Sequence, residues 1–212
     1  MIKNSIYSYD YHQPEGYRFS LDSVFLSQRV AKSLETYSNL GELKVLDLCA
    51  GCGVVGLELQ FHLPEIKKID FLEVQDIYLP FFEKNREQAI SANADFNFLN
   101  MNYAELLAPN FEGLYDVVVS NPPYFFLGEG LLSPNEFKNR CRFFIDSDFQ
   151  SLIESSLHVL KPNGKSFLLM RPGSHHGRDL IEEIKNLVHG RASVEIIDEV
   201  RGTDIVMLTK NL

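Results

Sequence analysis

The chain has 212 residues, 45% of them hydrophobic and 23% charged, a composition that excludes a collagen-like, low-complexity or fully disordered protein. The 29 acidic residues against 20 Lys and Arg give a net charge of −9, which argues against a generally basic, nucleic-acid-coating surface but allows a local basic patch. No apolar run approaches the roughly 20 residues that span a bilayer, and the start of the chain lacks a signal-peptide core. These features predict a cytoplasmic protein.

The chain reads as one domain, with a segment and a helix over residues 1–40 followed by the main body over 41–212. Short apolar runs predict strands at 43–48, 68–74, 96–100, 115–120, 165–170, 194–200 and 204–210. Helical patterns predict helices at about 20–37, 54–63, 76–92, 148–160 and 175–189. A long loop is expected over 121–146. The LKPNG segment at 160–164 is expected to end the helix predicted over 148–160.

Strand and helix signals alternate through most of the chain. This order predicts an α/β fold, with a mostly parallel central sheet and helices on both faces. Ligands on such folds sit beyond the carboxyl ends of the strands, so the loops after residues 48, 74, 100, 120 and 170 are the places to search for a site.

A glycine-rich turn follows the first predicted strand. Residues 51–56 read GCGVVG, a G-x-G-x-x-G pattern that allows a tight turn and close approach of backbone N–H groups to a ligand. Three interpretations fit: a dinucleotide site with Glu73 on a ribose hydroxyl, a site for S-adenosylmethionine (SAM) with the same acid, or a turn without a ligand. Asp47, at the end of the strand, favours SAM, because its carboxylate suits the ammonium group of that molecule.

The same turn contains a C-x-x-C pattern at Cys49 and Cys52, which also occurs in thioredoxin-type redox sites. A zinc site would need two more ligands, and Cys141 alone does not supply them. Because three cysteines cannot all pair within one chain, we expect reduced thiols. The simplest interpretation is that two small residues fill positions in the turn, and no metal site is predicted.

The segment after the fourth predicted strand, residues 116–124, reads DVVVSNPPY. Its two prolines cannot donate backbone hydrogen bonds and hold the chain in an extended turn. The side-chain carbonyl of Asn121 and the backbone carbonyl of Pro122 can then point the same way and accept hydrogen bonds from a planar –NH2 group. Tyr124 can stack on a flat substrate. A simple strand-ending turn would explain neither the asparagine before the prolines nor the aromatic residue after them.

With these motifs the chain resembles the SAM-dependent amino-group methyltransferases that carry Asn-Pro-Pro-Tyr. VLDLCAGCGVVGLEL resembles their first motif, FLEVQ the segment with their ribose-binding acid, and VVVSNPPY their catalytic motif. Within this group it is most similar to the bacterial tRNA adenine-N6 methyltransferases that modify a valine tRNA beside its anticodon, through YRFSLDSVFLS and SPNEFKNRCRF. The resemblance implies a Rossmann-like class I methyltransferase fold and SAM as the cofactor.

The resemblance also implies roles for individual residues. Asp47 and Gly51 would hold the methionine end of SAM, and Glu73 would take its ribose hydroxyls. Asn102 stands where such enzymes usually have an aspartate for the adenine amino group. The cofactor-binding set is then Asp47, Cys49, Gly51, Gly53, Glu73, Asn102 and Asn121. The catalytic set is Asn121, Pro122, Pro123 and Tyr124.

Basic residues after the catalytic motif and after the fifth predicted strand could form a local basic rim for RNA on an otherwise acidic body. Each of them could equally be a solvated surface charge, and Asp22 could equally be a helix N-cap. His175 and His176, beside Arg178, have no acidic partner at metal-ligand spacing. The predicted substrate-binding residues are Arg18, Asp22, Lys138, Arg140, Arg142 and Arg171.

The predicted function is methylation of the exocyclic N6 amino group of an adenine in RNA, with tRNA as the favoured substrate. One alternative is a protein glutamine N5-methyltransferase acting on a translation release factor, because the glutamine amide also presents a planar –NH2 group. Another is a degenerate methyltransferase fold that serves as a binding subunit, an alternative that Asn102 keeps open. The sequence does not predict the oligomeric state.

Overall fold

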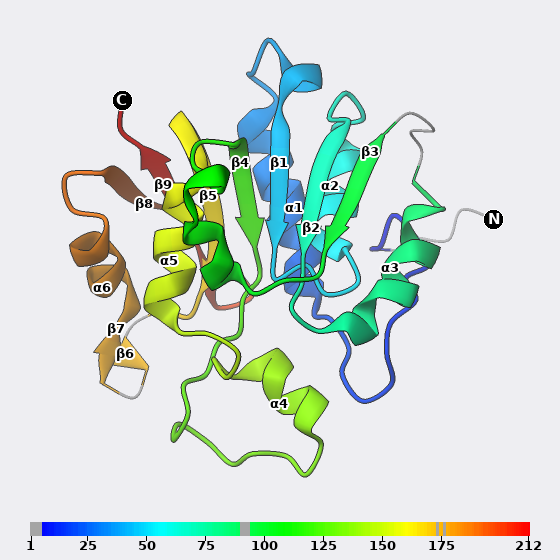
Figure 1. Ribbon diagram of the computed structural model, residues 1–212, viewed down its shortest axis with the longest axis vertical. Helices are drawn as coiled ribbons and strands as arrows, with labels where there is room; N and C mark the ends of the chain where they lie inside the picture. Colours follow the sequence, from blue (N-terminus) through cyan, green and yellow to red (C-terminus); the bar gives the residue numbers. More distant parts are fainter. Residues whose placement is uncertain (1–5, 90–93, 173, 176) are drawn as a thin grey trace.

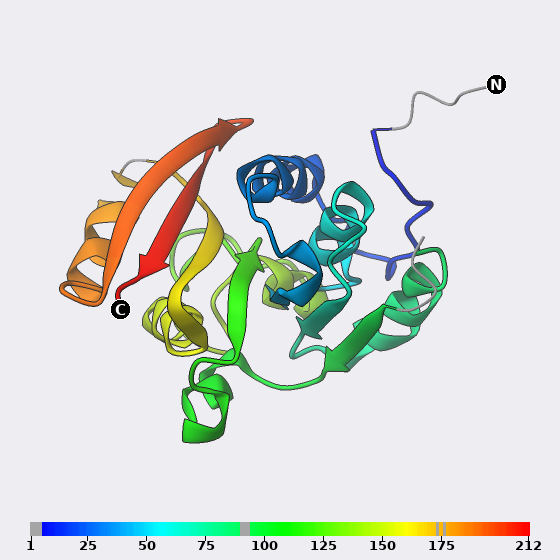
Figure 2. The same ribbon diagram turned by 90° about the horizontal axis from the view of Figure 1, so that it is seen from above.

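A seven-stranded sheet runs through the middle of the molecule in the order β3-β2-β1-β4-β5-β9-β8 (Figures 1 and 2). The computed structural model describes residues 6–89, 94–172, 174–175 and 177–212. Within these residues, no helix is long and apolar enough to cross a membrane. The strands of the sheet are β1 (Lys44–Leu48), β2 (Lys68–Leu72), β3 (Asp95–Leu99), β4 (Tyr115–Ser120), β5 (Leu160–Met170), β8 (Ala192–Val200) and β9 (Thr203–Lys210).

Helices fill most of the connections between the strands. They are α1 (Leu21–Leu34), α2 (Val54–His62), α3 (Leu79–Arg86), α4 (Glu136–Arg142), α5 (Phe149–His158) and α6 (Leu180–Leu187). Short 3-10 turns are η1 (Leu40–Glu42), η2 (Asp76–Tyr78), η3 (Tyr103–Leu107) and η4 (Pro109–Phe111). A separate pair of two-residue strands comprises β6 (Ser174–His175) and β7 (Arg178–Asp179).

The predicted mostly parallel sheet is confirmed. Strands β3, β2, β1, β4 and β5 pair in parallel, whereas β9 runs antiparallel to both β5 and β8. The chain goes from β1 to β2 on one side and returns to β4 on the other, so the strand order reverses between β1 and β4. At such a reversal the loops leave in opposite directions and open a crevice beyond the carboxyl ends of the strands.

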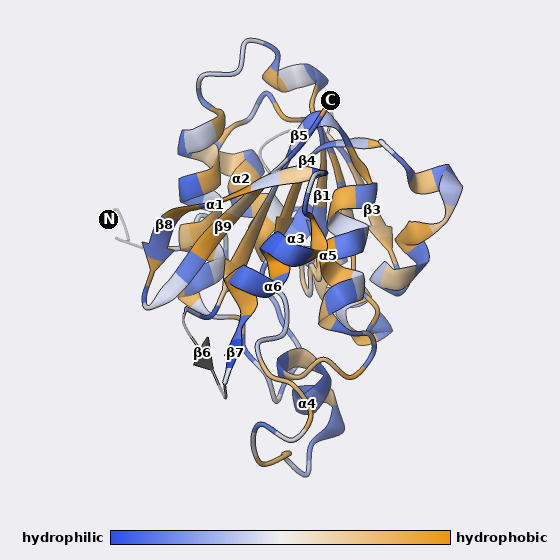
Figure 3. Cartoon of the chain, turned by 90° about the vertical axis from the view of Figure 1, so that its left-hand side faces the viewer, coloured by the Kyte–Doolittle hydropathy of each residue, from blue (hydrophilic) through white to orange (hydrophobic). Residues whose placement is uncertain are grey.

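Alternating side chains of the central strands supply two hydrophobic cores. Val45 points into the core shared with α1, α2 and α3, whereas Leu46 and Leu48 point into the core shared with η3, α5 and α6. Because both faces are covered, the central strands are apolar almost throughout, and they stand out as hydrophobic in Figure 3 while the outer helices carry polar residues.

Two predicted helices have different boundaries in the structure. The helix expected over 76–92 is the short turn η2 followed by α3, which has Pro80 in its first turn and ends at Arg86. Proline fits there because the first N–H groups of a helix have no partner within the helix. The helix expected over 175–189 is the shorter α6, which begins after β7.

Two segments expected to be irregular contain regular structure. The loop predicted over 121–146 includes α4, whose N-cap Asn135 accepts a hydrogen bond from the Lys138 N–H. The LKPNG segment was expected to end a helix, but β5 already begins at Leu160. The register between β4 and β5 shifts in this stretch, where Pro162 lacks an N–H and Asn163 has φ of 62°.

Gly56 of α2 lies where the helix packs tightly on the sheet. A Cβ atom at this position would lie 2.5 Å from Cε1 of Phe71 and 3.2 Å from Oδ2 of Asp47. We expect Gly56→Ala to lower the free energy of unfolding by about 2–3 kcal/mol, because neither the buried ring nor the carboxylate can move freely. Urea denaturation measures this loss. Gly41→Ala is the control, since its Cβ would only touch the Glu65 carbonyl at 3.6 Å; equal losses in both variants would contradict the packing argument.

Candidate active site

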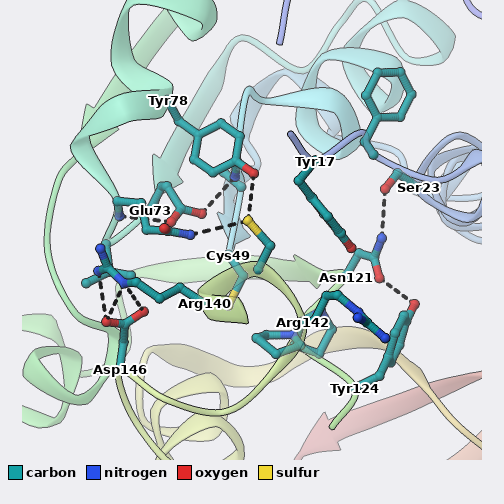
Figure 4. A pocket seen from close by; sticks show the side chains of 18 of the residues that line it. Tyr17, Ser23, Cys49, Glu73, Tyr78, Asn121, Tyr124, Arg140, Arg142 and Asp146 are labelled. Atoms are coloured by element: carbon teal, nitrogen blue, oxygen red, sulfur yellow. Dashed lines mark hydrogen bonds and ion pairs between the residues drawn. The ribbon is translucent and has the colours of Figure 1, made fainter. Parts of the chain in front are cut away.

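A cavity of about 350 Å³ is lined by residues that follow β1, β2 and β4 (Figure 4). The carboxyl ends of these strands point toward α4 (Figure 1). The walls of the cavity come from segments far apart in the sequence: parts of 13–23, 49–55 and 72–78, together with 121–125 and 140–147. The N-terminal segment and α4 thus close over the glycine-rich turn and the Asn-Pro-Pro-Tyr turn. The two motifs singled out in the sequence face one cavity.

The structure brings most of the predicted site residues to this cavity. Those that line it are Asp22, Cys49, Gly51, Glu73, Asn121, Pro122, Pro123, Tyr124, Arg140, Arg142 and Arg171. Those that do not line it are Arg18, Asp47, Gly53, Asn102 and Lys138. His176 lies outside the described residues, and of His175 only its place in β6 is described.

Two of the residues outside the cavity are engaged elsewhere. Asn102 caps η3, accepting from the Ala104 N–H at 2.9 Å, and its amide donates to the Asp146 carbonyl at 2.6 Å. Arg18 lines a separate depression beside the aromatic residues of the N-terminal segment. In this structure neither side chain lies at the cavity where the sequence predicted it.

The N–H groups of the three glycines in the glycine-rich turn are each used within the protein. Gly51 donates to Oε2 of Glu73 at 3.0 Å, and Gly53 donates to the Ala50 carbonyl at 2.8 Å. Gly56 donates to Oδ2 of Asp47 at 2.8 Å. A pyrophosphate needs free donors and is repelled by carboxylates, so this geometry argues against the dinucleotide interpretation.

Glu73 and Asp47 are buried carboxylates beside the turn. Glu73 accepts from the Gly51 and Gln75 N–H groups, and burial nevertheless raises its pKa to about 7. Burial also raises the pKa of Asp47 to about 7, since only Oδ2 is hydrogen-bonded and Oδ1 has no partner among the described residues. Asp47 lies beneath the turn rather than on the cavity wall.

These raised pKa values predict a pH-dependent stability. The folded protein holds protons on Asp47 and Glu73 up to about pH 7, whereas the unfolded chain releases them near 3.8 and 4.5. The folded state therefore binds more protons between about pH 4 and 7, and the free energy of unfolding falls as pH rises through this window. For Asp47 the loss is up to about 4 kcal/mol.

Asp47→Asn isolates this contribution. The amide can still accept from the Gly56 N–H but cannot ionise, so we expect the variant to lose less stability than the wild type between pH 5 and 8. Chemical denaturation across that range measures how the free energy of unfolding changes with pH in the wild type and in the variant. Identical slopes would mean that Asp47 is already ionised at pH 5.

Asn121 has both ends of its amide engaged. It follows β4 directly, and its Nδ2 donates to Ser23 Oγ at 2.8 Å, while its Oδ1 accepts from the Tyr124 hydroxyl at 2.5 Å (Figure 4). Ser120, one residue earlier, ties β4 to β1 because its hydroxyl donates to the Leu48 carbonyl at 2.6 Å. The amide oxygen therefore has a defined orientation, and one of its two lone pairs is used by tyrosine.

The Asn-Pro-Pro-Tyr turn is hydrogen-bonded to the last residue of α4. The N–H groups of Tyr124 and Phe125 both donate to the Arg142 carbonyl, at 3.1 and 3.0 Å. The Arg171 guanidinium lies over the Tyr124 ring, 5.1 Å from its centroid, so a flat substrate has to use another face of that ring. Arg142 lies 5.1 Å from the centroid of Phe125.

The predicted basic residues divide into paired and unpaired cations. Arg140 forms an ion pair with Asp146, and Arg178 forms one with Glu183. Within the described part of the chain, Arg142 and Arg171 have no carboxylate partner at salt-bridge distance. Of the arginines that line the cavity, these two therefore keep a full positive charge available for an anion.

Several cavity residues were missed by the sequence interpretation, among them Tyr17, Ser23, Tyr78 and Cys141. Tyr17 and Ser23 lie in the YRFSLDSVFLS segment that carried the resemblance, so the signal was present although it was assigned to their neighbours Arg18 and Asp22. Tyr78 lies 3.2 Å from Cys141, its hydroxyl to Sγ, across 63 residues, and no local pattern announces that contact.

The C-x-x-C pattern lacks the electrostatics of a redox site. Burial raises the pKa of Cys49 well above its usual value and that of Cys52 to about 12, so both are thiols rather than reactive thiolates at neutral pH. Cys49 also has φ of 63°, a conformation that favours glycine, within the turn. This supports the interpretation of two small residues in a tight turn.

A comparison with known families identifies this arrangement. The profile of the methyltransferase small domain matches residues 20–131, which is more than half of the chain and includes the glycine-rich turn, Glu73 and the Asn-Pro-Pro-Tyr turn. The chain belongs to the methyltransferase small domain family. The resemblance read from the sequence is thereby confirmed at the level of the family.

Curated relatives of this methyltransferase-family chain have different substrates in their names. A release factor glutamine methyltransferase of Neisseria gonorrhoeae is 28% identical over 177 residues, covering 79% of this chain and 60% of the relative. A tRNA1(Val) (adenine(37)-N6)-methyltransferase of Tolumonas auensis is 28% identical over 133 residues, covering 61% of this chain and 52% of the relative. The chain thus spans between half and two thirds of these relatives.

Solved structures share the fold. A 16S rRNA guanine-N2 methyltransferase from Thermus thermophilus, solved with AdoMet and guanosine, superimposes with a TM-score of 0.63 at 18% identity. The match covers 93% of this chain and 45% of that one. The predicted Rossmann-like class I methyltransferase fold is confirmed, and family and fold together support SAM as the cofactor.

Proposed function

We propose that this methyltransferase-family chain transfers the methyl group of SAM to the N6 amino group of an adenine in RNA, with tRNA as the favoured substrate. The observation that carries the proposal is the Asn121 amide, which Ser23 and Tyr124 orient at the cavity. Arg142 and Arg171 line the same cavity, and neither pairs with a carboxylate among the described residues. An amide acceptor suits a planar –NH2 group, and free guanidinium groups suit the phosphates that flank a base.

The residues at the glycine-rich turn fit SAM. In our proposal Glu73 binds the ribose hydroxyls, since each carboxylate oxygen accepts only one backbone N–H and keeps a lone pair for a hydroxyl. Above its raised pKa of about 7, the Asp47 carboxylate places negative charge beneath the turn through Oδ1, which has no partner among the described residues, and this charge favours the cationic amino acid end. SAM supplies a methyl group on a positively charged sulfur. Asn102 has no part in this proposal, because η3 and Asp146 use its side chain.

The protein's task at the acceptor is to improve a poor nucleophile. The lone pair of an aromatic amine is delocalised into its ring, so the nitrogen must become pyramidal to attack. Hydrogen bonds from the two amino hydrogens to Asn121 Oδ1 and the Pro122 carbonyl favour that shape and stabilise the positive charge that develops on nitrogen. Tyr124 presents a ring on which the base can stack, worth roughly 1–3 kcal/mol.

The proposal is tested by incubating the protein with labelled SAM and unmodified tRNA, with release factor as a parallel acceptor, followed by nucleoside analysis. We expect label in N6-methyladenosine. An Arg142→Ala/Arg171→Ala variant should raise the KM for tRNA about 10-fold or more and weaken its salt dependence. Arg86→Ala/Arg191→Ala is the charge-matched control, because Arg86 pairs with Glu83, Arg191 pairs with Glu154, and neither arginine lines the cavity.

Protein glutamine methylation is the second candidate. It is favoured by the match to release factor glutamine methyltransferases and by the fact that a glutamine amide also presents a planar –NH2 group. In that case label appears in the release factor, and the Arg142→Ala/Arg171→Ala variant methylates the release factor at nearly the wild-type rate. Label in neither acceptor, from a protein that binds SAM, would overturn both substrate proposals.

A further inference from the structure

Ser23, in the first turn of α1, forms a hydrogen bond with the Asn121 amide. Its Oγ accepts from Asn121 Nδ2 at 2.8 Å across 98 residues, and Ser23 is only 4% exposed. It belongs to the first turn of α1, where its N–H donates to the Ser20 carbonyl at 3.2 Å. The serine hydroxyl is therefore held at a fixed point of the cavity wall (Figure 4).

We propose that Ser23 is a positioning residue that holds the Asn121 amide with its oxygen, rather than its –NH2 group, facing the substrate –NH2 group. This inference rests on the proposed amino-group methylation. An asparagine side chain can rotate by half a turn and exchange its oxygen and its –NH2 group with little change in shape. Only the observed orientation presents an acceptor to a substrate –NH2, whereas the rotated one opposes donor to donor.

In the observed orientation the Ser23 hydroxyl accepts a hydrogen bond from the amide –NH2 group, and this hydrogen bond stabilises that orientation. Tyr124 acts in the same sense from the other side, because its hydroxyl donates to Oδ1. The hydrogen bond to Ser23 also draws electron density toward the amide oxygen and strengthens it as an acceptor. Ser23 touches neither the reacting nitrogen nor the methyl donor in this mechanism, so it acts through Asn121.

The test is a double-mutant cycle between Ser23→Ala and Asn121→Ala, with kcat and both KM values measured on the acceptor. In the wild-type background we expect Ser23→Ala to lower kcat about 10- to 100-fold with little change in the KM for SAM. In the Asn121→Ala background the same substitution should not lower kcat further, because Ser23 acts on the reaction through the Asn121 side chain, which this variant lacks. Equal losses in both backgrounds would overturn the proposal.

Two variants separate positioning from stability. Ser27 lies one turn further along α1 and is also buried, and its hydroxyl donates to the Ser23 and Val55 carbonyls. Ser27→Ala should lower the melting temperature but leave kcat near the wild-type value. Ser23→Thr keeps the hydroxyl and should recover most of the activity lost in Ser23→Ala; its failure to do so in a folded variant would count against the proposal.

A readout without substrate distinguishes this inference from the proposed function. In protein labelled with 15N-asparagine, the Asn121 side-chain –NH2 signals are identified by their loss in Asn121→Ala. We expect the chemical shifts of these signals to change in Ser23→Ala and to remain at their wild-type values in Ser27→Ala. A wild type that methylates no acceptor would reject the proposed function alone, whereas unmoved signals in Ser23→Ala would reject the role of Ser23.

Discussion

Replacing Asn121 with alanine should lower kcat about 100- to 1,000-fold while the Kd for SAM stays within a few-fold of the wild type. The amide oxygen is the acceptor that acts as the amine becomes positive, so its loss is felt in the transition state more than in the bound ground state. Radiolabel transfer measures kcat, and isothermal titration measures the Kd. The Asn121 side chain lies at the end of β4, outside both hydrophobic cores, so the variant should fold.

Asn121→Asp is the matched variant for this prediction. It keeps an oxygen acceptor but replaces the –NH2 group, so it cannot donate to Ser23 as the asparagine does. We expect intermediate activity. Normal turnover in Asn121→Ala would exclude the amino-group mechanism, and loss of SAM binding in that variant would make Asn121 a cofactor residue instead.

Replacing Glu73 with alanine should raise the Kd for SAM about 100-fold. At pH 8, above the raised pKa of Glu73, hydrogen bonds to its ionised carboxylate are worth roughly 1.5–3 kcal/mol each, and the variant also leaves the Gly51 and Gln75 N–H groups without their acceptor. Glu73→Gln retains one oxygen and should lose about 10-fold. Titration of SAM into each variant measures the change.

Glu83→Gln is the control for the lost charge. Glu83 is a carboxylate of α3 paired with Arg86 and does not line the cavity, so its replacement should leave the Kd unchanged. An unchanged Kd in folded Glu73→Ala would remove Glu73 from the cofactor site. A wild type that does not bind SAM at all would instead support the alternative of a binding subunit with a degenerate fold.

The strands and the two motifs could be predicted from local sequence. The run YDVVVS is apolar on both faces because β4 is covered on both sides, and this pattern matched the observed strand. The glycine-rich turn and Asn-Pro-Pro-Tyr were predicted to meet because the carboxyl ends of parallel strands share one edge of a sheet, and they do line one cavity. Helix α4 was missed, because its short helical pattern lies among proline, glycine and phenylalanine.

The positions of side chains around the motifs depended on tertiary packing. The resemblance placed Asp47 and Asn102 in the cofactor set, but in the fold the Asp47 carboxylate lies beneath the glycine-rich turn and the Asn102 amide caps η3. Distance along the chain fixes which loop a residue belongs to. It does not fix the direction of its side chain, which is chosen by competition among nearby donors and acceptors.

Local patterns in the sequence therefore determined the α/β architecture and the loops that form the cavity, because hydrophobic period and turn chemistry act over a few residues. The family followed from the resemblance of the motifs in those loops to known methyltransferases. Tertiary structure alone decided that Ser23 hydrogen-bonds Asn121 across 98 residues and that Arg140 pairs with Asp146. It also decided that Arg142 and Arg171 lie over aromatic rings and pair with no acid in the described part of the chain. Such contacts join segments that meet only after the sheet has formed, and no local pattern encodes them.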